Sequence, residues 1–348
     1  MIQVKGYAAS SPTTPLAPYS FERRELRDHD VLVDILFSGI CHSDIHQVRD
    51  EWGGSIYPMV PGHEIVGKVI KVGEHVDKFK VGDIAGVGVM IDSCRECKPC
   101  ESFMEQYCVE GMTGTYNSYE RDKVTIAQGG YSTQIVCDER YVYQISDKLD
   151  LAGVAPLLCA GITTYSPLMF AKVKSGDKVA IAGLGGLGHM GVKFAVAMGA
   201  EVTMISSSPS KEKDAKKLGA HQFVLSTDKT EMKKYESYFD VMLNTLSAKH
   251  NFETYLNLLN LEGKMLVVGL PKEHPNVNPM ALIYNRRSII GSMIGGTVET
   301  QAMLNYCAEK NIVADVEVMP MQKINEAYER ILKKDVKYRF VIDMSSLK

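Results

Sequence analysis

The sequence predicts an α/β protein with two domains, one mainly β and one built around a doubly wound parallel sheet. The chain has 348 residues, whereas a single domain usually takes about 100–200. Short β-type runs and turn glycines dominate residues 1–150, and from residue 175 onward apolar strands alternate with helix-like segments. Such alternation is typical of βαβ units and therefore of a parallel sheet.

The individual elements follow from the same patterns. In the first part, three runs predict strands: Val31–Phe37, Ile65–Val72 and the segment from Gly129-Gly130 through Val136. In the second part, six runs predict the strands of one sheet: Val179–Ala182, Glu201–Ser206, Gln222–Ser226, Asp240–Asn244, Lys264–Gly269 and Ser288–Ile294. Helix-like segments include Lys211–Leu218 and Asn251–Leu259, and later Thr300–Glu309 and Ile324–Lys333, before a last strand at Arg339–Asp343. Six strands match a complete dinucleotide-binding sheet.

Composition and charge exclude several classes of protein. Hydrophobic residues make up 45% and charged residues 23%, which argues against a disordered chain. The net charge is −3, and the densest basic stretch, Lys211–Lys217, also carries acidic residues, so no nucleic-acid partner is expected. The most apolar stretch, Val179–Ala200, holds six glycines, a histidine and a lysine, which does not suit a membrane span. The first residues contain no continuous apolar segment of the kind found in a secretory signal, and we expect a cytoplasmic protein.

A glycine-rich motif follows the first strand of the predicted sheet and opens a helix. It consists of Gly183-Leu184-Gly185-Gly186-Leu187-Gly188. In this context glycines permit a tight turn and let the backbone approach a pyrophosphate, which then lies at the positive end of the helix. A glycine-rich turn without a ligand is the alternative. We interpret the motif as the phosphate loop of a dinucleotide site.

The end of the second strand indicates which dinucleotide the site would bind. An NAD site places an Asp or Glu about 20 residues beyond the loop, where it binds the ribose 2′-hydroxyl. Here the strand ends in Ser206-Ser207-Ser208-Pro209-Ser210-Lys211. Hydroxyl groups and an ammonium group can bind a 2′-phosphate, which a carboxylate would repel. The sequence therefore predicts NADP(H) rather than NAD(H), and the alternative is that these residues only form a solvated helix cap.

Four of the eight cysteines lie within fifteen residues, as Cys94-x-x-Cys97-x-x-Cys100-x7-Cys108. In a long chain such a cluster indicates metal ligands rather than disulfides. Four thiolates suit tetrahedral zinc in a closed, structural site. An iron–sulfur cluster is the competing interpretation, but the seven-residue gap and the Val109 that follows differ from the ferredoxin pattern. Cys137 and Cys307 have no partner pattern, and we expect them to be packed thiols.

Three further motifs each contain a Cys or His that would be unremarkable alone. They are Cys41-His42-Ser43-Asp44, Gly62-His63-Glu64-Ile65-Val66-Gly67 and Leu158-Cys159-Ala160-Gly161. Together with the four-cysteine segment, the glycine loop and the chain order, they resemble the zinc-dependent medium-chain alcohol dehydrogenases over essentially the whole chain. Met112–Tyr116, Leu184–Gly191 and the serine-rich second strand are similar to the cinnamyl alcohol dehydrogenase branch, which reduces aromatic and aliphatic aldehydes with NADPH.

This resemblance implies a domain organisation and a second metal site. Residues 1–154 and 295–348 would form a GroES-like, zinc-binding catalytic domain, and residues 155–294 would form an NADP-binding Rossmann domain. Cys41, His63 and Cys159 would bind a catalytic zinc ion, with Glu64 as a fourth ligand that gives way to water or substrate. A zinc ion with three protein ligands and an open position acts as a Lewis acid.

The resemblance also implies roles in proton transfer and orientation. Ser43 would hydrogen-bond the reacting oxygen and pass its proton through the nicotinamide ribose to His46. An imidazole suits the end of such a relay because its pKa lies near neutrality. Asp44 would orient His63.

For the ligands, the resemblance implies contacts on both domains. Thr163 would lie near the nicotinamide, and Ser206, Ser207 and Lys211 would contact the 2′-phosphate. Trp52 and Ile294 lie where the branch lines its substrate pocket, and packing roles are an equal alternative for both.

These residues lead to an expected activity with several alternatives. We expect an NADP(H)-dependent alcohol dehydrogenase or aldehyde reductase with two zinc ions per chain, one catalytic and one structural, and a small aldehyde or alcohol as substrate. An NAD-dependent zinc alcohol or polyol dehydrogenase is the nearest alternative. A zinc-free quinone or enoyl reductase would lack the ligand set, and a zinc-binding regulatory protein is a remote possibility. Gly295-Gly296 follow the last strand of the sheet, whose edge could pair with that of a second subunit, and we therefore expect a homodimer.

Overall fold

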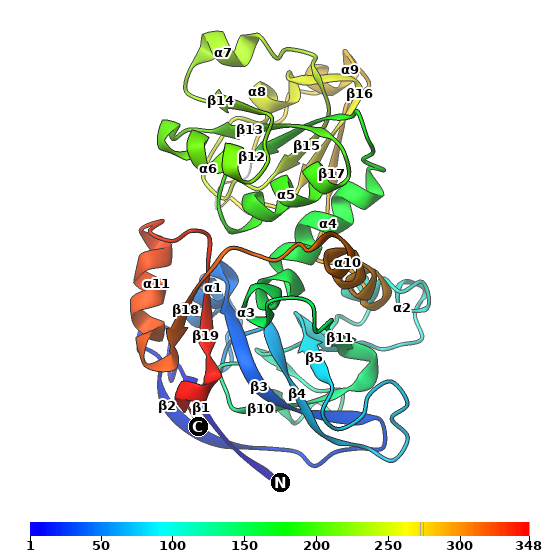
Figure 1. The fold of residues 1–348 in the computed structure, drawn as a ribbon, viewed down its shortest axis with the longest axis vertical. Coiled ribbons are helices and arrows are strands. Elements are labelled where there is room, and N and C mark those ends of the chain that lie inside the picture. The colour runs from blue at the N-terminus through cyan, green and yellow to red at the C-terminus, as the bar shows by residue number, and fades with distance from the viewer. Residues whose placement is uncertain (272, 274, 348) are drawn as a thin grey trace. The chain divides into compact units, whose positions relative to one another are not determined.

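The computed structural model describes residues 1–271, 273 and 275–347. They form two compact units, Met1–Cys159 with Gly295–Lys348, and Ala160–Ile294, which are called the first and second unit below (Figure 1). The chain crosses between the units twice, after Cys159 and after Ile294. The first crossing follows Cys159 rather than residue 154, the boundary that the resemblance implied.

The second unit contains a six-stranded parallel sheet in the order β14-β13-β12-β15-β16-β17. Its strands are β12 (Lys178–Ala182), β13 (Glu201–Ser206), β14 (Gln222–Leu225), β15 (Phe239–Asn244), β16 (Leu259–Val267) and β17 (Ser288–Gly291). All neighbouring pairs in this sheet are parallel. The order is that of a dinucleotide-binding sheet, in which β12 lies at the centre where the direction of winding reverses. The predicted parallel α/β sheet is thereby confirmed.

Helices connect these strands and cover the sheet (Figure 1). They are α4 (Ala160–Phe170), α5 (Gly186–Ala197), η4 (Pro209–Lys211), α6 (Glu212–Lys217), α7 (Lys229–Lys233), α8 (Phe252–Leu256) and α9 (Met280–Ile283). Four consecutive residues of β12 are fully buried: Val179, Ala180, Ile181 and Ala182. A strand covered on both faces needs apolar residues at consecutive positions, which is why these strands form continuous apolar runs in the sequence.

The first unit is built on a seven-stranded, mainly antiparallel sheet with the order β11-β5-β4-β3-β19-β18 and with β10 paired to β3. Its strands are β3 (Asp30–Ile40), β4 (Ile65–Val72), β5 (Ile84–Val87), β10 (Gln134–Asp138), β11 (Val142–Gln144), β18 (Val316–Pro320) and β19 (Arg339–Asp343). The eleven-residue strand β3 pairs with β4, β10 and β19. The C-terminal strands therefore complete the sheet begun by the N-terminal part of the chain.

Smaller elements of the first unit surround this sheet. Three two-stranded sheets pair β1 (Ile2–Ala8) with β2 (Ala17–Arg23), β6 (Met90–Asp92) with β7 (Thr113–Gly114), and β8 (Ser118–Tyr119) with β9 (Ile126–Ala127). The helices are α1 (His42–Val48), α2 (Lys98–Glu101), η1 (Glu105–Tyr107), η2 (Glu139–Tyr141), α3 (Leu151–Val154), η3 (Ala155–Leu158), α10 (Thr297–Lys310), η5 (Met321–Lys323), α11 (Ile324–Leu332) and η6 (Met344–Leu347). α10 and α11 occupy the predicted helical segments.

Several predicted element limits are wrong. The helix expected over Asn251–Leu259 ends at Leu256, and Leu259 already begins β16, where it pairs with Phe239. The apolar spacing of Leu256, Leu258 and Leu259 suits burial in either element, and sheet pairing decides between them. The strand expected over Ser288–Ile294 ends at Gly291, and Ile294 has a φ of 39°, which is incompatible with an extended strand.

The strand expected from Gly129 also begins later, at Gln134. Gly129 and Gly130 instead donate backbone hydrogen bonds to the carbonyls of Val60 and Gly62, at 2.6 and 2.8 Å. A Cβ on Gly129 would overlap the carbonyl oxygens of Pro61 and Gly62. This close backbone contact holds the loop that precedes His63.

Within the described residues, no single helix is both long and apolar enough to cross a membrane; one bent pair, Leu151–Leu158 with Ala160–Phe170, passes on length and composition alone.

Candidate active site

The structure brings four predicted metal ligands of the first unit together. Ligand atoms of Cys41, His63, Glu64 and Cys159 all lie within 4.8 Å of one another. They come from three places in the chain. Cys41 follows β3 and is the N-cap of α1, the pair His63-Glu64 immediately precedes β4, and Cys159 follows η3. Because β3 and β4 are paired strands, the sheet holds the first two places side by side.

The donor set and its spacing fit zinc. Tetrahedral zinc with Zn–S bonds of about 2.3 Å places two sulfur atoms about 3.8 Å apart. The Sγ atoms of Cys41 and Cys159 are 3.9 Å apart. Two thiolates, one imidazole and one carboxylate therefore form a set that can hold the ion with one replaceable ligand.

Asp44 organises this group from its buried position on α1. Its Oδ1 lies 2.9 Å from Nδ1 of His63 and accepts from the Gly62 N–H at 3.2 Å. Its Oδ2 accepts from the Cys41 N–H at 2.9 Å and from the Tyr131 hydroxyl at 3.0 Å. A carboxylate accepts hydrogen bonds, so His63 donates from Nδ1, and its Nε2 would be the atom that binds a metal ion. One carboxylate thus orients both Cys41 and His63.

Glu64 is held on one side and open on the other. Its Oε1 pairs with the guanidinium of Arg339, which also donates to the Ile40 carbonyl at 3.0 Å. Its Oε2 is buried and has no hydrogen-bond partner among the described residues. Gly39 makes room for this oxygen, because a Cβ at that position would overlap it. An orphaned buried carboxylate oxygen beside two thiols fits the position of a metal ligand.

In the metal-free chain this group of four side chains holds protons that a metal ion would displace, because a ligand must be deprotonated to bind the ion. The hydrogen bond from Cys159, aided by His63, holds the pKa of the Cys41 thiol well below its usual value, while the same contact and burial raise the pKa of Cys159. Burial opposes a charge on His63, yet Asp44 and Cys41 raise the pKa of His63 well above its usual value. Burial raises the pKa of Glu64 to about 7. A divalent cation would neutralise this concentration of acidic groups.

The predicted proton-relay residues lie on α1. Ser43 is partly exposed, and His46, at the end of the helix, lies 2.7 Å from Oε2 of Glu51 through its Nδ1. The His46 ring stacks on that of His42 and lies tilted beside that of Trp52, with centroid distances of 4.6 and 5.1 Å. Trp52 is 49% exposed. No Ser43–His46 hydrogen bond is present in the described part of the chain, and the strongest polar partner of His46 is Glu51.

A second cluster consists of the four remaining predicted ligands. We call the segment Cys94–Cys108 the four-cysteine lobe. The ligand atoms of Cys94, Cys97, Cys100 and Cys108 lie within 4.8 Å of one another. The Sγ distances are 3.8 Å for Cys94–Cys100 and 3.4 Å for Cys97–Cys100, close to the separation expected around tetrahedral zinc. The backbone N–H groups of Val109 and Cys100 lower the pKa of Cys97 to about 6, which favours the thiolate that zinc requires.

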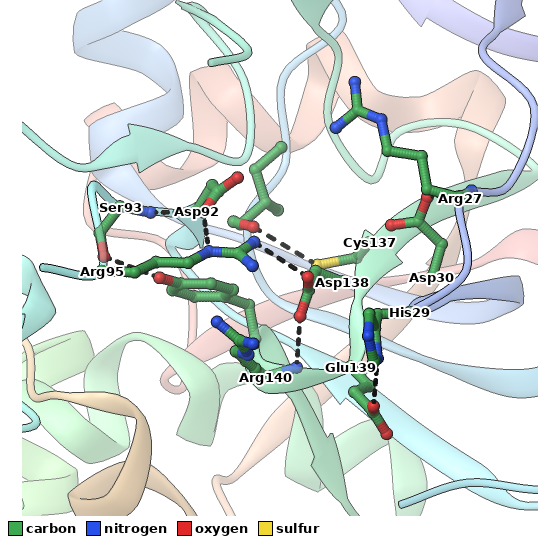
Figure 2. Close-up of polar contacts among 12 residues, drawn as sticks. Arg27, His29, Asp30, Asp92, Ser93, Arg95, Cys137, Asp138, Glu139 and Arg140 are labelled. Carbon is green, nitrogen blue, oxygen red and sulfur yellow. Dashed lines mark hydrogen bonds and ion pairs between the residues drawn. The ribbon is translucent and has the colours of Figure 1, made fainter. Parts of the chain in front are cut away.

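Arg95 connects the four-cysteine lobe to neighbouring residues of the first unit (Figure 2). Its guanidinium donates to Asp92 at 2.9 Å and pairs with Asp138 at 2.9 Å, and it lies 5.8 Å from the ring centre of Tyr141. Ser93 links the Tyr141 hydroxyl, at 2.8 Å, to the lobe. The lobe is therefore tied to β10 and η2 of the first unit.

The glycine motif occupies the turn between β12 and α5 in the second unit. Gly183 has a φ of 96°, a left-handed value that favours glycine. A Cβ on Gly188 would overlap the carbonyl oxygen of Gly183. Gly185 is the N-cap of α5, and no atom lies within 4 Å of the position that its Cβ would take. The turn is thus tightly packed at Gly188 and has open space at Gly185, beside the N-terminus of α5, which suits a pyrophosphate.

The other predicted cofactor residues are distributed around the second unit. Lys211 donates from Nζ to the Leu184 carbonyl at 2.6 Å, which brings the end of β13 to the glycine loop. Ser206 is buried and accepts from the Ser208 N–H at 3.3 Å, whereas Ser207 is exposed. Thr163, on α4, and Ile294 are 9% and 8% exposed.

Sequence reasoning missed several residues of the first group. Glu51, Tyr131 and Arg339 contact His46, Asp44 and Glu64. Glu51 follows His46 by five residues and could have been noticed as a nearby carboxylate. Tyr131 and Arg339 belong to distant segments, and only the folded sheet brings them to the group. Cys137 and Cys307 are buried, at 1% and 0% exposure, and lie outside both clusters.

Comparison with known proteins gives a consistent result. The family model described as an alcohol dehydrogenase GroES-like domain matches residues 27–147, and the model described as a zinc-binding dehydrogenase matches residues 186–309. The chain is 52% identical to the NADP-dependent alcohol dehydrogenase C 1 of Mycolicibacterium smegmatis, over 100% of both chains. It is 51% identical to the aldehyde reductase YahK of Escherichia coli, over 99% of both.

Among solved structures, the chain is similar to a cinnamyl alcohol dehydrogenase from Sorghum bicolor. The TM-score is 0.95 and the identity is 43%, with 99% of this chain and 98% of the other covered. The GroES-like and Rossmann-type fold class expected from the sequence is confirmed by these matches.

Proposed function

Because the chain belongs to the zinc-dependent medium-chain alcohol dehydrogenases, in the branch of the cinnamyl alcohol dehydrogenases, we propose that it interconverts aldehydes and alcohols with NADP(H). The aldehyde reductase of Escherichia coli and the NADP-dependent alcohol dehydrogenase of Mycolicibacterium smegmatis support the substrate class and the cofactor. Aromatic and aliphatic aldehydes are the proposed substrates.

The observation that carries this proposal is the group of Cys41, His63, Glu64 and Cys159. The four cysteines of the four-cysteine lobe leave no place for a substrate atom. The catalytic group, in contrast, includes the carboxylate of Glu64, which is paired with Arg339. Arg339 could hold this carboxylate when a substrate oxygen replaces it as a ligand. Such an arrangement of strong and replaceable ligands distinguishes a catalytic zinc site from a structural one.

The chain's own residues then position the reactants. When bound, zinc supplies a Lewis acid and NADPH supplies a hydride. Asp44 fixes the orientation of His63 and the backbone of Cys41. We assign to Ser43 a hydrogen bond to the reacting oxygen and to His46 the exchange of its proton with solvent. Glu51, 2.7 Å from His46, would keep one imidazole nitrogen engaged so that the other faces the relay.

The cofactor preference is assigned to the end of β13. The exposed hydroxyl of Ser207 and the ammonium of Lys211, which already lies against the glycine loop, are proposed to contact the 2′-phosphate together with Ser206. Replacing Ser207 with Asp is expected to weaken NADPH binding and to leave NADH binding unchanged or improved, because a carboxylate repels the 2′-phosphate and can bind a ribose hydroxyl. An unchanged preference for NADPH would contradict this assignment.

The activity itself is tested by following nicotinamide absorbance with NADPH and a panel of benzaldehyde, cinnamaldehyde and short aliphatic aldehydes. We expect turnover with NADPH to exceed that with NADH. Thr163 is proposed to lie near the nicotinamide, and Trp52 and Ile294 to line the substrate pocket. If none of the aldehydes is reduced by a protein that holds two zinc ions, the proposed function is wrong.

We further propose that the enzyme is a homodimer and acts in the reducing cytoplasm. β17 has an unpaired edge within the described sheet, and Ile283 and Tyr284, just before it, are 64% and 78% exposed. An unpaired strand edge, together with exposed apolar side chains in the segment that precedes it, favours pairing with a second copy. A sedimentation measurement tests the dimer, and a monomer at micromolar concentration would refute it. Two clusters of thiols support the reducing compartment.

A further inference from the structure

Glu105, in the four-cysteine lobe, connects the lobe to a distant part of the chain. This residue opens η1, three positions before Cys108, and is 7% exposed. Both of its carboxylate oxygens contact Thr297, the first residue of α10. Oε2 accepts from the Thr297 N–H at 3.0 Å, and Oε1 accepts from the Thr297 hydroxyl at 2.7 Å.

Glu105 supplies a cap that the helix itself lacks. The N-cap position of α10 is Gly296, which has no side chain to accept hydrogen bonds from the first turn. A Cβ on Gly296 would overlap the Phe103 carbonyl of the lobe and lie 2.9 Å from Oε2 of Glu105. A carboxylate at a helix N-terminus also interacts favourably with the helix dipole. The lobe and the start of α10 are therefore fitted to each other.

The start of α10 lies beside one of the two points where the chain passes between the units. This second crossing lies between Ile294 and Gly295, two residues before the contact with Glu105. Ile294 itself has a φ of 39°, an unusual value for a branched residue. At the first crossing, Cys159 is a member of the catalytic group. Each metal cluster thus holds the chain next to one crossing.

The body of α10 is attached independently of Glu105. Gln301 accepts from the Gln144 N–H at 2.8 Å and donates to the Gln144 carbonyl at 3.0 Å. Thr300 donates to the Gly296 carbonyl at 2.8 Å. Loss of the Glu105 carboxylate would consequently loosen the first turn and the crossing, while the helix stays docked on β11.

We propose that Glu105 is a positioning residue for hydride transfer. It transmits the rigidity of the four-cysteine lobe to residues 294–297, and so restricts the segment by which the cofactor unit is attached to the catalytic unit. The inference rests on the proposed function, because its consequence is measured on NADPH. It gives the structural metal a role in cofactor binding and turnover in addition to local stability.

The test is Glu105→Gln in the full chain with both metals. Glutamine keeps the size but can accept through only one oxygen, and it carries no charge for the helix dipole. We expect two zinc ions per chain, a dissociation constant for NADPH raised at least about fivefold, and a lower kcat with little change in the KM for aldehyde. NADPH fluorescence titration, steady-state kinetics and elemental analysis provide these readouts.

Two further variants make the result decisive. Glu101→Gln removes the same charge from an exposed position in the same lobe and should leave NADPH binding and kcat unchanged. Thr297→Ala removes one partner of Glu105, and its effect should be smaller, in the same direction and not additive with Glu105→Gln. If Glu105→Gln does not fold, Thr297→Ala alone decides the outcome.

A lower melting temperature with unchanged NADPH binding and kcat would show that Glu105 is only a helix cap, and the proposal would be overturned. Equal effects of Glu101→Gln and Glu105→Gln would also overturn it, because the effect would then come from the charge of the lobe. Wild-type protein without any NADPH-dependent turnover would instead refute the proposed function, so the two failures are distinguishable.

Discussion

Replacing Asp44 with Asn should separate the catalytic metal group from the rest of the fold. Each oxygen of Asp44 accepts two hydrogen bonds, from His63 and Gly62 at Oδ1 and from Cys41 and Tyr131 at Oδ2. An asparagine that keeps its oxygen toward His63 turns its NH2 group toward the Cys41 N–H, so that two donors face each other. The Tyr131 hydroxyl can rotate to accept, but a backbone N–H cannot.

The size of the effect follows from this geometry. A buried donor without an acceptor costs about 1–3 kcal/mol. Loss of a hydrogen-bond partner behind a metal ligand typically lowers metal affinity about 10–100-fold, which corresponds to about 1.4–2.8 kcal/mol. The four-cysteine lobe shares none of these bonds. We therefore expect Asp44→Asn to lose affinity for one zinc ion per chain by about 10–100-fold and to lose turnover in parallel.

Competition with a chromophoric chelator measures both zinc ions in one experiment, and the ion in the four-cysteine lobe is the internal reference. Asp28→Asn, at a side chain that is 71% exposed, is the matched control and should behave as wild type. Tyr131→Phe removes only one of the four hydrogen bonds and should fall between the two. The role assigned to Asp44 would be refuted if Asp44→Asn releases each zinc ion at the same chelator concentration as wild type and keeps full turnover.

Three other predictions concern the two units separately. Cys159→Ala should abolish turnover and leave a folded protein with one zinc ion per chain, whereas Cys307→Ala, at a buried thiol outside both clusters, should keep both ions. Elemental analysis and an activity assay check this pair, and full activity of Cys159→Ala would refute the assignment of Cys159 to the catalytic site. Gly188→Ala should destabilise the second unit because its Cβ overlaps the Gly183 carbonyl, whereas Gly185→Ala, with open space at its Cβ, should melt as wild type and lose NADPH affinity. A wild-type melting temperature for Gly188→Ala would contradict the first expectation, and an unchanged NADPH affinity for Gly185→Ala would contradict the second. In metal-free protein, burial raises the pKa of Glu64 from 4.5 to about 7, so the folded chain binds a proton that the unfolded chain releases, and stability should fall by up to about 3 kcal/mol as the pH rises from about 4.5 to 7. The free energy of unfolding of Glu64→Gln, measured with urea, should lack this decrease. Identical pH profiles of wild type and Glu64→Gln would contradict the prediction.

The fold of the second unit was accessible from sequence because its sheet is covered on both faces. Buried strands such as Val179–Ala182 must be apolar at every position, and the glycine turn between β12 and α5 follows directly from a steric requirement. Element limits failed where the local pattern suits two structures. The spacing of Leu256, Leu258 and Leu259 suits a helix or a strand, and only the pairing of Leu259 with Phe239 decides between them.

The candidate active site was accessible in part. Motifs supplied the candidate metal ligands, which the structure brings together, because their types and neighbours are specific. The supporting residues could not be found in this way. Arg339 lies 275 positions from Glu64, and Tyr131 lies 87 positions from Asp44. Their roles depend on β19 and on the loop before β10 reaching the same end of the sheet as β3 and β4, which local sequence patterns do not encode.

The two metal groups differ in a way that explains how one chain can use both. In the four-cysteine lobe, the ligands lie within one short segment, and this segment fixes Arg95 on one side and Glu105 on the other. A metal there can rigidify neighbouring structure but offers no replaceable ligand. In the catalytic group, three distant segments must converge, and Asp44 and Arg339 are engaged in holding the ligands in place. The catalytic group makes no contact of this kind with residues 295–297 among the described hydrogen bonds, so we assign control of the crossing after Ile294 to the four-cysteine lobe, through the carboxylate of Glu105.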